Sequence, residues 1–239
     1  MINETIEKDG FAIHENILNR QQTDSLLASL QLDAHIGTRT RQGTIYAARN
    51  LLQISEVQRL VQSPEVRALV EPFLDKAAFA VRGILFDKNN AANWKVIWHQ
   101  DISIAIKEKF ETPGYGPWTQ KAGVPHVQPP AEVLERMLTV RLHLDDCHAN
   151  NGPLKVLSGS HLEGKLHAAA IVQWRDRANE TICTVPRGGA LLMKPLLLHA
   201  SSPAVVPEHR RVIHLDFAAH PLANGLQWYE RCYLYPSRN

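Results

Sequence analysis

The sequence has few cysteines and no long apolar run, and each shortage excludes a class of protein. Its three cysteines lie far apart and form no CxxC pair, which argues against a disulfide framework or a structural zinc site. The apolar runs at 77–86 and 190–199 are interrupted by Arg82 and by Lys194-Pro195. Neither run is long enough to span a bilayer, so we expect no membrane partner.

Charge of one sign is also lacking. The 26 basic and 24 acidic residues give a formal net charge of +2. No block of like charge is long enough to follow a phosphate backbone, so nucleic acid is not an expected partner. The chain shows no basic start followed by an apolar stretch and a small-residue cleavage site, and we therefore expect a cytoplasmic protein.

The length and composition are enough for a substantial core. With 239 residues, 44% of them hydrophobic, the chain fits one β-rich domain with helical additions. No internal repeat or Gly/Ser linker divides it. We expect a single domain with a helical N-terminal third at 1–76, a β core at 77–218 and a short C-terminal extension at 219–239.

The local patterns change from helical to extended near residue 77. Two helix starts are indicated before it, one capped by Asn19 or Thr23 and one at Ser63-Pro64. After it, short β-branched and aliphatic runs alternate with turn signals. They predict eight strands, at 77–86, 94–99, 102–107, 137–145, 153–157, 181–185, 189–199 with a break at Pro195, and 210–218. Eight short antiparallel strands around a cavity describe a jelly roll.

The run at 137–145 indicates where the cavity lies. Its two sides differ, with Val140, Leu142 and Leu144 alternating with Thr139, Arg141, His143 and Asp145. A face this polar is not expected to pack against a partner sheet, so it is predicted to line a wet cavity. The Pro- and Gly-rich segment 110–130, which includes Lys121, forms either a wall or lid of that cavity or a surface excursion.

The pattern His-x-Asp offers three candidate metal-binding pairs, namely His99/Asp101, His143/Asp145 and His214/Asp216. Side chains two apart on a strand point the same way, so spacing alone does not choose among them. His99 and Asp101 follow the apolar run 96–98, and His199 follows the apolar run 196–198. Both breaks indicate strand ends at a cavity mouth. Two imidazoles and one carboxylate can hold iron(II) and leave positions open for oxygen and an organic co-substrate.

A cation is expected beside these three residues. Arg210 begins the last predicted strand, which turns back beside the strand that ends at His199. Its planar guanidinium matches a carboxylate and suits the far end of 2-oxoglutarate. Arg211 is the rival, because neighbouring residues of a strand face opposite ways. We favour Arg210.

Several short motifs stand in a fixed order along the chain: Asp9-Gly10-Phe11-Ala12-Ile13, Trp98-His99-Gln100-Asp101, Asn151-Gly152-Pro153-Leu154, Gly159-Ser160-His161, and Gly188-Gly189 through His199 to Arg210. Together they resemble the phytanoyl-CoA dioxygenase family of iron(II)/2-oxoglutarate-dependent oxygenases, over most of the chain. The resemblance implies a double-stranded β-helix, with iron ligands His99, Asp101 and His199. It also implies Arg210 as the 2-oxoglutarate anchor and Ser201 as an added hydroxyl hydrogen bond. One departure is Ser158, where the family often has proline.

The resemblance also implies a reaction. With iron(II), 2-oxoglutarate and O2, the enzyme would hydroxylate an unactivated C–H bond and release succinate and CO2. Related halogenases carry a small residue in place of Asp101, so hydroxylation is favoured over halogenation. Two alternatives stay open: a cupin-like metalloenzyme that does not use 2-oxoglutarate, and a non-enzymatic β-sandwich that binds a small carboxylated ligand. No basic cluster suited to the phosphates of CoA is visible in the sequence, so we expect a smaller metabolite as substrate.

Overall fold

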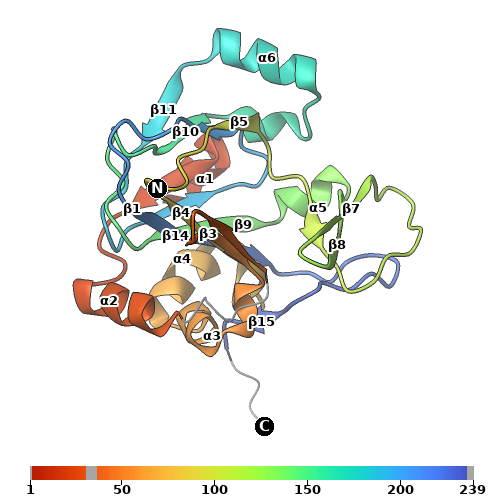
Figure 1. Ribbon diagram of the computed structural model, residues 1–239. Coiled ribbons are helices and arrows are strands. Elements are labelled where there is room, and N and C mark those ends of the chain that lie inside the picture. Colours follow the sequence, from red (N-terminus) through yellow and green to blue (C-terminus); the bar gives the residue numbers. More distant parts are fainter. Residues whose placement is uncertain (1, 31–36, 236–239) are drawn as a thin grey trace.

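The computed structural model describes residues 2–30 and 37–235, and antiparallel β-sheets form its centre (Figure 1). The strands are β1 (Phe11–His14), β2 (Thr38–Arg41), β3 (Thr44–Arg49), β4 (Phe79–Lys88), β5 (Val96–His99), β6 (Ile104–Ala105), β7 (Trp118–Lys121), β8 (Val124–Val127), β9 (Leu138–His143), β10 (Leu154–Leu157), β11 (Glu180–Cys183), β12 (Ala190–Met193), β13 (His199–Ser201), β14 (Arg210–Ala218) and β15 (Cys232–Tyr233). The helices are α1 (Ile2–Asp9), α2 (Arg20–Ser29), α3 (Ser55–Val61), α4 (Pro64–Leu74), α5 (Ala131–Glu135) and α6 (Ala168–Arg177), with 3-10 turns at Leu51–Gln53 and Ser160–Glu163. No helix in the described ranges is both long enough and apolar enough to cross a membrane.

The strands form three antiparallel sheets. The large sheet has the order β1-β12-β9-β14-β4-β3-β2, with β15 also pairing with β4. The small sheet has the order β11-β10-β13-β5, and a third sheet has the order β6-β8-β7. Many neighbours in these sheets are distant along the chain, so the sheet order brings remote residues together. The expectation of a mostly antiparallel β protein is confirmed.

Helices cover one face of the large sheet. Figure 1 shows α2, α3 and α4 grouped on the opposite side of this sheet from β5 and β10. Val140 and Leu142 of β9 are fully buried in one cluster with Leu69 and Val70 of α4. Each such side chain contributes about 1.5–3 kcal/mol on burial. Because side chains alternate along a strand, the intervening residues of β9, such as Arg141, face the opposite side, toward the small sheet.

The helical N-terminal third is wrong as an expectation. The region does contain α1 to α4, and Asn19 caps α2 as expected, accepting a hydrogen bond from the Gln22 amide at 2.9 Å. Between these helices, however, β1 extends one edge of the large sheet and β2 and β3 extend the other. The β2–β3 hairpin turns through Gln42 and Gly43, which both have positive φ, at 49° and 76°. A two-residue turn of this kind is typical of a β-hairpin. It was not predicted, because the helix starts on either side of it indicated a helical region.

Each of the eight predicted runs after residue 77 overlaps a strand, and the break at Pro195 is confirmed, because β12 ends at Met193 and β13 begins at His199. The segment 110–130 is more ordered than expected. It contains the β7–β8 hairpin, and β8 pairs with β6. The turn of this hairpin passes through Ala122 and Gly123, again with positive φ at both residues.

Candidate metal centre

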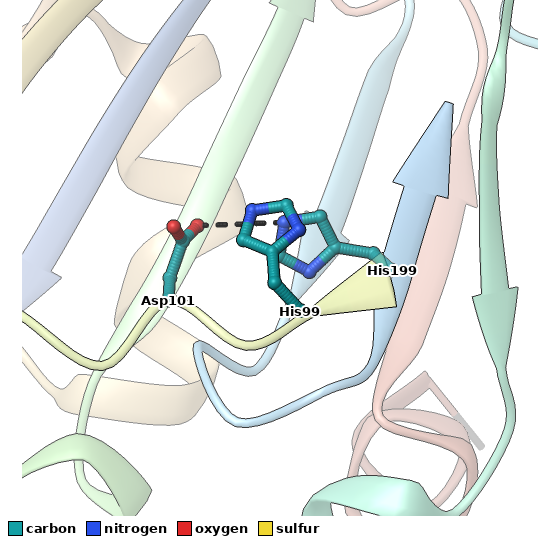
Figure 2. Close-up of side chains that lie close together, drawn as sticks. All are labelled: His99, Asp101 and His199. Atoms are coloured by element: carbon teal, nitrogen blue, oxygen red, sulfur yellow. Dashed lines mark ion pairs between the residues drawn. The ribbon is translucent and has the colours of Figure 1, made fainter. Parts of the chain in front are cut away.

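The two strands β5 and β13 bring His99 and His199 together. The Cα atoms of these residues are direct partners in the small sheet, and their ring centroids are 4.2 Å apart. Asp101 lies just beyond β5, and its Oδ2 is 3.8 Å from His199 Nε2. Figure 2 shows the three side chains converging. Within residues 2–30 and 37–235 this is the one group of three such side chains whose ligand atoms all lie within 4.8 Å of one another.

Both histidines are held in the tautomer that frees Nε2. His99 Nδ1 donates to the Ile97 carbonyl at 2.8 Å, and His199 Nδ1 donates to the Leu197 carbonyl at 2.9 Å. A carbonyl oxygen can only accept, so the proton of each neutral ring is on Nδ1. The Nε2 lone pairs are then available to a metal, with each ring oriented by its backbone partner.

The electrostatics of the site favour metal-binding protonation states. Burial lowers the pKa of His199 to about 4, although the Asp101 carboxylate opposes this shift. Burial alone would raise the pKa of Asp101, but the charges of His199, His214 and Arg82 outweigh it and lower that pKa to about 2. At neutral pH the site therefore offers a carboxylate and a neutral imidazole, which are the forms that bind metals.

The turn between His99 and Asp101 is held by Gln100, whose side chain is buried. Gln100 Nε2 donates to the carbonyls of Leu196 and Gly164 at 2.6 and 2.8 Å, and its Oε1 accepts from the Leu166 amide at 2.8 Å. The Asp101 amide in turn donates to the Pro195 carbonyl at 2.9 Å. The carbonyls of Pro195 and Leu196, which lie between β12 and β13, thus accept hydrogen bonds that hold the turn between His99 and Asp101.

The pair His214/Asp216 belongs to a buried network beside the cavity, which His214 also lines. Arg82 Nε contacts Asp216, Thr139 Oγ1 donates to Asp216 Oδ1 at 2.7 Å, and His214 Nε2 donates to the same oxygen at 3.0 Å. Arg141 Nη1 donates to His214 Nδ1 at 2.9 Å. Arg82 and His214 lower the pKa of Asp216 against the effect of burial. Both carboxylate oxygens of Asp216 are engaged in this network, so the pair His214/Asp216 has a structural role beside the site.

The pair His143/Asp145 is separated by the end of β9. Asp145 accepts from Arg211 three times, from the backbone amide and Nε at 2.8 Å each and from Nη2 at 2.6 Å. His143 is buried, and neither ring nitrogen has a hydrogen-bond partner among the described residues. Burial, followed by the charges of Arg141 and Arg210, holds the pKa of His143 well below its usual value.

A cavity of about 240 Å³ contains the three converging residues, and Arg141, Ser201 and Arg210 also line it. Arg210 is 3% exposed, and its Nε and Nη1 atoms have no partner within the described ranges. Arg211 is engaged with Asp145 instead. Unpaired donors on a buried guanidinium are costly, and such a group is suited to binding a carboxylate.

Ser201 is held by a buried lysine that the sequence did not single out. Lys88 Nζ donates to Ser201 Oγ at 2.6 Å and to the Ser202 carbonyl at 2.7 Å. Burial, followed by the charge of Arg210, lowers the pKa of Lys88 to about 7. Gly152 has φ +70°, and a Cβ built there would lie 3.0 Å from Lys88 Nζ. The turn at Asn151-Gly152 therefore needs glycine both for its conformation and for this close approach.

Other cavity residues were also missed. Arg49 and Arg82 line the cavity from β3 and β4, in regions read as a helix and as a hydrophobic strand. Lys121 lines it from the β7–β8 hairpin, which supports the wall interpretation of segment 110–130 over a passive excursion. The only available signal was a charged residue inside or at the end of an extended run, which is too common to be specific.

Comparison with known proteins gives a family match. A family model described as phytanoyl-CoA dioxygenase (PhyH) matches residues 6–212. No curated protein matches the chain by sequence.

Three solved structures illustrate the shared fold. The alpha ketoglutarate dependent epimerase SnoN from nogalamycin biosynthesis has 16% identity and a TM-score of 0.66, over 90% of this chain and 80% of its own. EctD from S. alaskensis, solved with 2-oxoglutarate and 5-hydroxyectoine, has 18% identity and a TM-score of 0.67, over 90% and 74%. AviO1 from Streptomyces viridochromogenes Tue57 has 21% identity and a TM-score of 0.65, over 93% and 96%. At these identities the likeness establishes the fold alone.

Proposed function

Because the chain belongs to the phytanoyl-CoA dioxygenase family, we propose that it is an iron(II)/2-oxoglutarate-dependent dioxygenase that hydroxylates an unactivated C–H bond of a small metabolite. One observation carries the proposal. Three metal-binding side chains converge in a cavity that also contains a buried arginine with unpaired donors. A metal site beside a carboxylate receptor is what this co-substrate requires.

The three side chains fit iron(II). His99 and His199 would bind through Nε2 and Asp101 through its carboxylate, which leaves further positions for exogenous ligands. When bound, iron(II) with 2-oxoglutarate and O2 supplies oxidation of a C–H bond coupled to decarboxylation of 2-oxoglutarate to succinate and CO2. The backbone partners of the rings and the Gln100 contacts hold the ligands in place before the metal arrives.

The co-substrate fits the opposite wall. Arg210 would receive the distal carboxylate of 2-oxoglutarate through its guanidinium, whose Nε and Nη1 donors have no partner among the described residues. Ser201 Oγ accepts a hydrogen bond from Lys88 Nζ, so its own hydroxyl hydrogen can be donated to the same carboxylate. The carboxylate would replace the contacts of Ser201 to backbone carbonyls at 3.3 and 3.4 Å, which are long.

The size of the cavity supports a small substrate. About 240 Å³ lies below the range of about 300–1,000 Å³ typical of sites for drug-sized ligands. Apolar groups of Ile84, Phe86 and Val96 also line it and limit access of water to the reacting groups. Asp101 provides the carboxylate that favours hydroxylation over halogenation.

The test is turnover without a known substrate. Purified protein with iron(II), ascorbate, O2 and 2-oxoglutarate should form succinate at a slow uncoupled rate, and His99→Ala should abolish it. Metal binding without 2-oxoglutarate binding would favour the cupin-like alternative. Binding of 2-oxoglutarate without any succinate would favour the non-enzymatic alternative.

The reaction type needs its own measurement, because similar structures include an epimerase and a carbocyclase. Once a substrate is found, turnover under ¹⁸O2 should place one labelled oxygen in the product of a hydroxylase. A product of unchanged oxygen content would reject hydroxylation while keeping 2-oxoglutarate dependence.

A further inference from the structure

The cavity wall on the Asp101 side carries a second group of cations. Arg49 at the end of β3, Arg82 in β4 and Lys121 at the end of β7 all line the cavity that holds the metal ligands. They come from different elements than Arg210, which begins β14, and Ser201, which ends β13. The wall therefore forms a cationic region distinct from the proposed 2-oxoglutarate anchor.

Two contacts between elements create this wall. In the large sheet, Arg49 of β3 is the direct partner of Ile84 of β4, which places it beside the cavity. The β7–β8 turn approaches the start of β2, since a Cβ built on Gly37 would lie 3.7 Å from the Ala122 Cβ and 3.4 Å from the Arg49 carbonyl oxygen. The hairpin thus brings Lys121 to the cavity beside β3.

Ser103 joins two of the cations. Lys121 Nζ donates to Ser103 Oγ at 2.8 Å, and Arg82 Nη1 donates to the Ser103 carbonyl at 3.2 Å. These contacts fix both side chains at the cavity wall and supply no negative charge. Arg82 has a counter-charge in Asp216, whereas Ser103 gives Lys121 only a neutral partner.

The charges in this wall oppose one another. Burial lowers the pKa of Lys121, and the charges of Arg82 and Arg49 lower it further. Burial, and then the charges of Arg82 and Arg39, lowers the pKa of Arg49, and the Asp101 carboxylate opposes the shift at both Arg49 and Lys121. Keeping these groups close costs free energy in the empty protein, and an anion bound between them would recover it.

The cavity as a whole is electropositive. Among the described residues it is lined by five cationic side chains, Arg49, Arg82, Lys121, Arg141 and Arg210, and by one carboxylate, Asp101. Iron(II) would add two positive charges and 2-oxoglutarate two negative ones. The bound co-substrate therefore leaves the excess of positive charge among the lining side chains unchanged.

We propose that Arg49 and Lys121 bind an anionic group, a carboxylate or a phosphate, of the primary substrate. The inference rests on the proposed function, because it takes the cavity as the active site. The sequence shows no basic cluster suited to the phosphates of CoA, and this smaller cluster could not be seen there because it is assembled from β3, β4 and β7. The size of the cavity restricts the ligand to a small acid or a small phosphorylated metabolite.

Titration calorimetry of the full chain with inorganic phosphate and with acetate tests the site directly, with neutral acetamide as the control ligand. Each titration is made on the protein alone and again with Mn(II) and 2-oxoglutarate present. We expect at least one of the two anions to bind in both states and acetamide not to bind. Loss of one charge-assisted hydrogen bond in Arg49→Gln or Lys121→Gln should weaken binding by about 10-fold or more. Lys109→Gln, which removes an exposed cation beside Trp118 of the same hairpin, should leave binding unchanged.

Several outcomes would overturn the inference. Absence of anion binding to the wild-type protein is one, and equal losses from Lys121→Gln and Lys109→Gln are another. Competition between the anion and 2-oxoglutarate, together with a raised 2-oxoglutarate requirement in Arg49→Gln, would assign these cations to the co-substrate. Lys121→Arg keeps the charge and should retain binding, and thermal melting of each variant reports whether it folds.

The failure of this proposal and that of the proposed function are distinguishable. If the protein neither binds nor decarboxylates 2-oxoglutarate but binds phosphate or acetate through Arg49 and Lys121, the oxygenase reading fails and the anion site stands. If succinate forms normally and neither anion binds, only the anion site fails. In turnover, small acids or phosphorylated metabolites should stimulate succinate formation, whereas their methyl esters or dephosphorylated forms should not. Which of the two series is active identifies carboxylate or phosphate.

Discussion

His99 and His199 are direct cross-strand partners, and their imidazole rings lie 4.2 Å apart with both Nδ1 atoms turned toward backbone carbonyls. This single pairing fixes the spacing of the two imidazoles that we propose as metal ligands. Asp101 completes the set from the turn that follows β5.

Removal of a ligand should therefore abolish metal binding without unfolding the protein. We expect His99→Ala or His199→Ala to lower iron(II) affinity by more than about 100-fold, since even outer contacts of metal ligands are worth about 10- to 100-fold. His220→Ala, at an exposed position, is the matched control. Metal content after gel filtration and anaerobic iron titration measure the effect. Stoichiometric iron in His199→Ala would remove this residue from the site.

Substitutions of the adjacent residues Arg210 and Arg211 should differ in their effect on the 2-oxoglutarate requirement. Arg210→Gln loses charge-assisted hydrogen bonds to the co-substrate, and we expect the half-saturating 2-oxoglutarate concentration to rise by about 100-fold, for a loss of about 3 kcal/mol. Arg211→Gln should leave that concentration nearly unchanged, because Arg211 is paired with Asp145. Succinate formation at varied 2-oxoglutarate measures both. An equal rise in the two variants would reverse the assignment.

Gln100 should affect both the stability of the protein and its iron affinity, through the turn that carries Asp101. Gln100→Ala leaves two carbonyls and one amide without partners in a buried turn, and we expect unfolding free energy to fall by about 3 kcal/mol. Iron affinity should fall as well, because the turn orients Asp101. Urea unfolding and iron titration test this together, with Gln120→Ala on the exposed hairpin as control. Unchanged iron affinity in a folded Gln100→Ala protein would show that the turn is held by other contacts.

Lys88 should make stability depend on pH. Its pKa is about 7 in the folded protein and near 10.5 when unfolded, so the unfolded chain binds more protons between these values. The free energy of unfolding should then rise with pH across this window, by at most about 1.4 kcal/mol per pH unit, and the full cost of the charge is present below it. Urea unfolding of the ligand-free protein at about pH 7.5 and about pH 9.5 measures the slope. Lys88→Met should show a smaller slope, and an identical slope in both proteins would refute the effect.

Asp216 should stabilise the buried network that it forms with Arg82 and His214. Asp216→Asn removes the charge that Arg82 and His214 face in a buried network, and leaving Arg82 without its counter-charge should cost about 3–5 kcal/mol. Thermal or urea unfolding measures this loss. Asp176→Asn, on the exposed helix α6, is the control. A loss of less than about 1 kcal/mol would indicate that the network relaxes around the neutral amide.

Parts of the fold were predictable because local pattern and final environment agree. The strands β4, β9 and β14 read as strands since they are rich in β-branched and aliphatic residues and are buried on both faces. The β2–β3 and β7–β8 hairpins were missed because their strands are short, and β2 and β7 are polar and partly exposed, so they lack the apolar pattern of a buried strand.

The sequence by itself determined the start of the strand that carries Arg210, and it indicated the types and order of the proposed ligands. Only the tertiary structure decided that Arg210 faces the cavity while Arg211 pairs with Asp145, and that Arg49, Arg82 and Lys121 meet in one wall. The reason is physical. Residue type and local period are properties of a short segment, whereas convergence depends on which strands pair and in what register, and that is set by burial of the whole core.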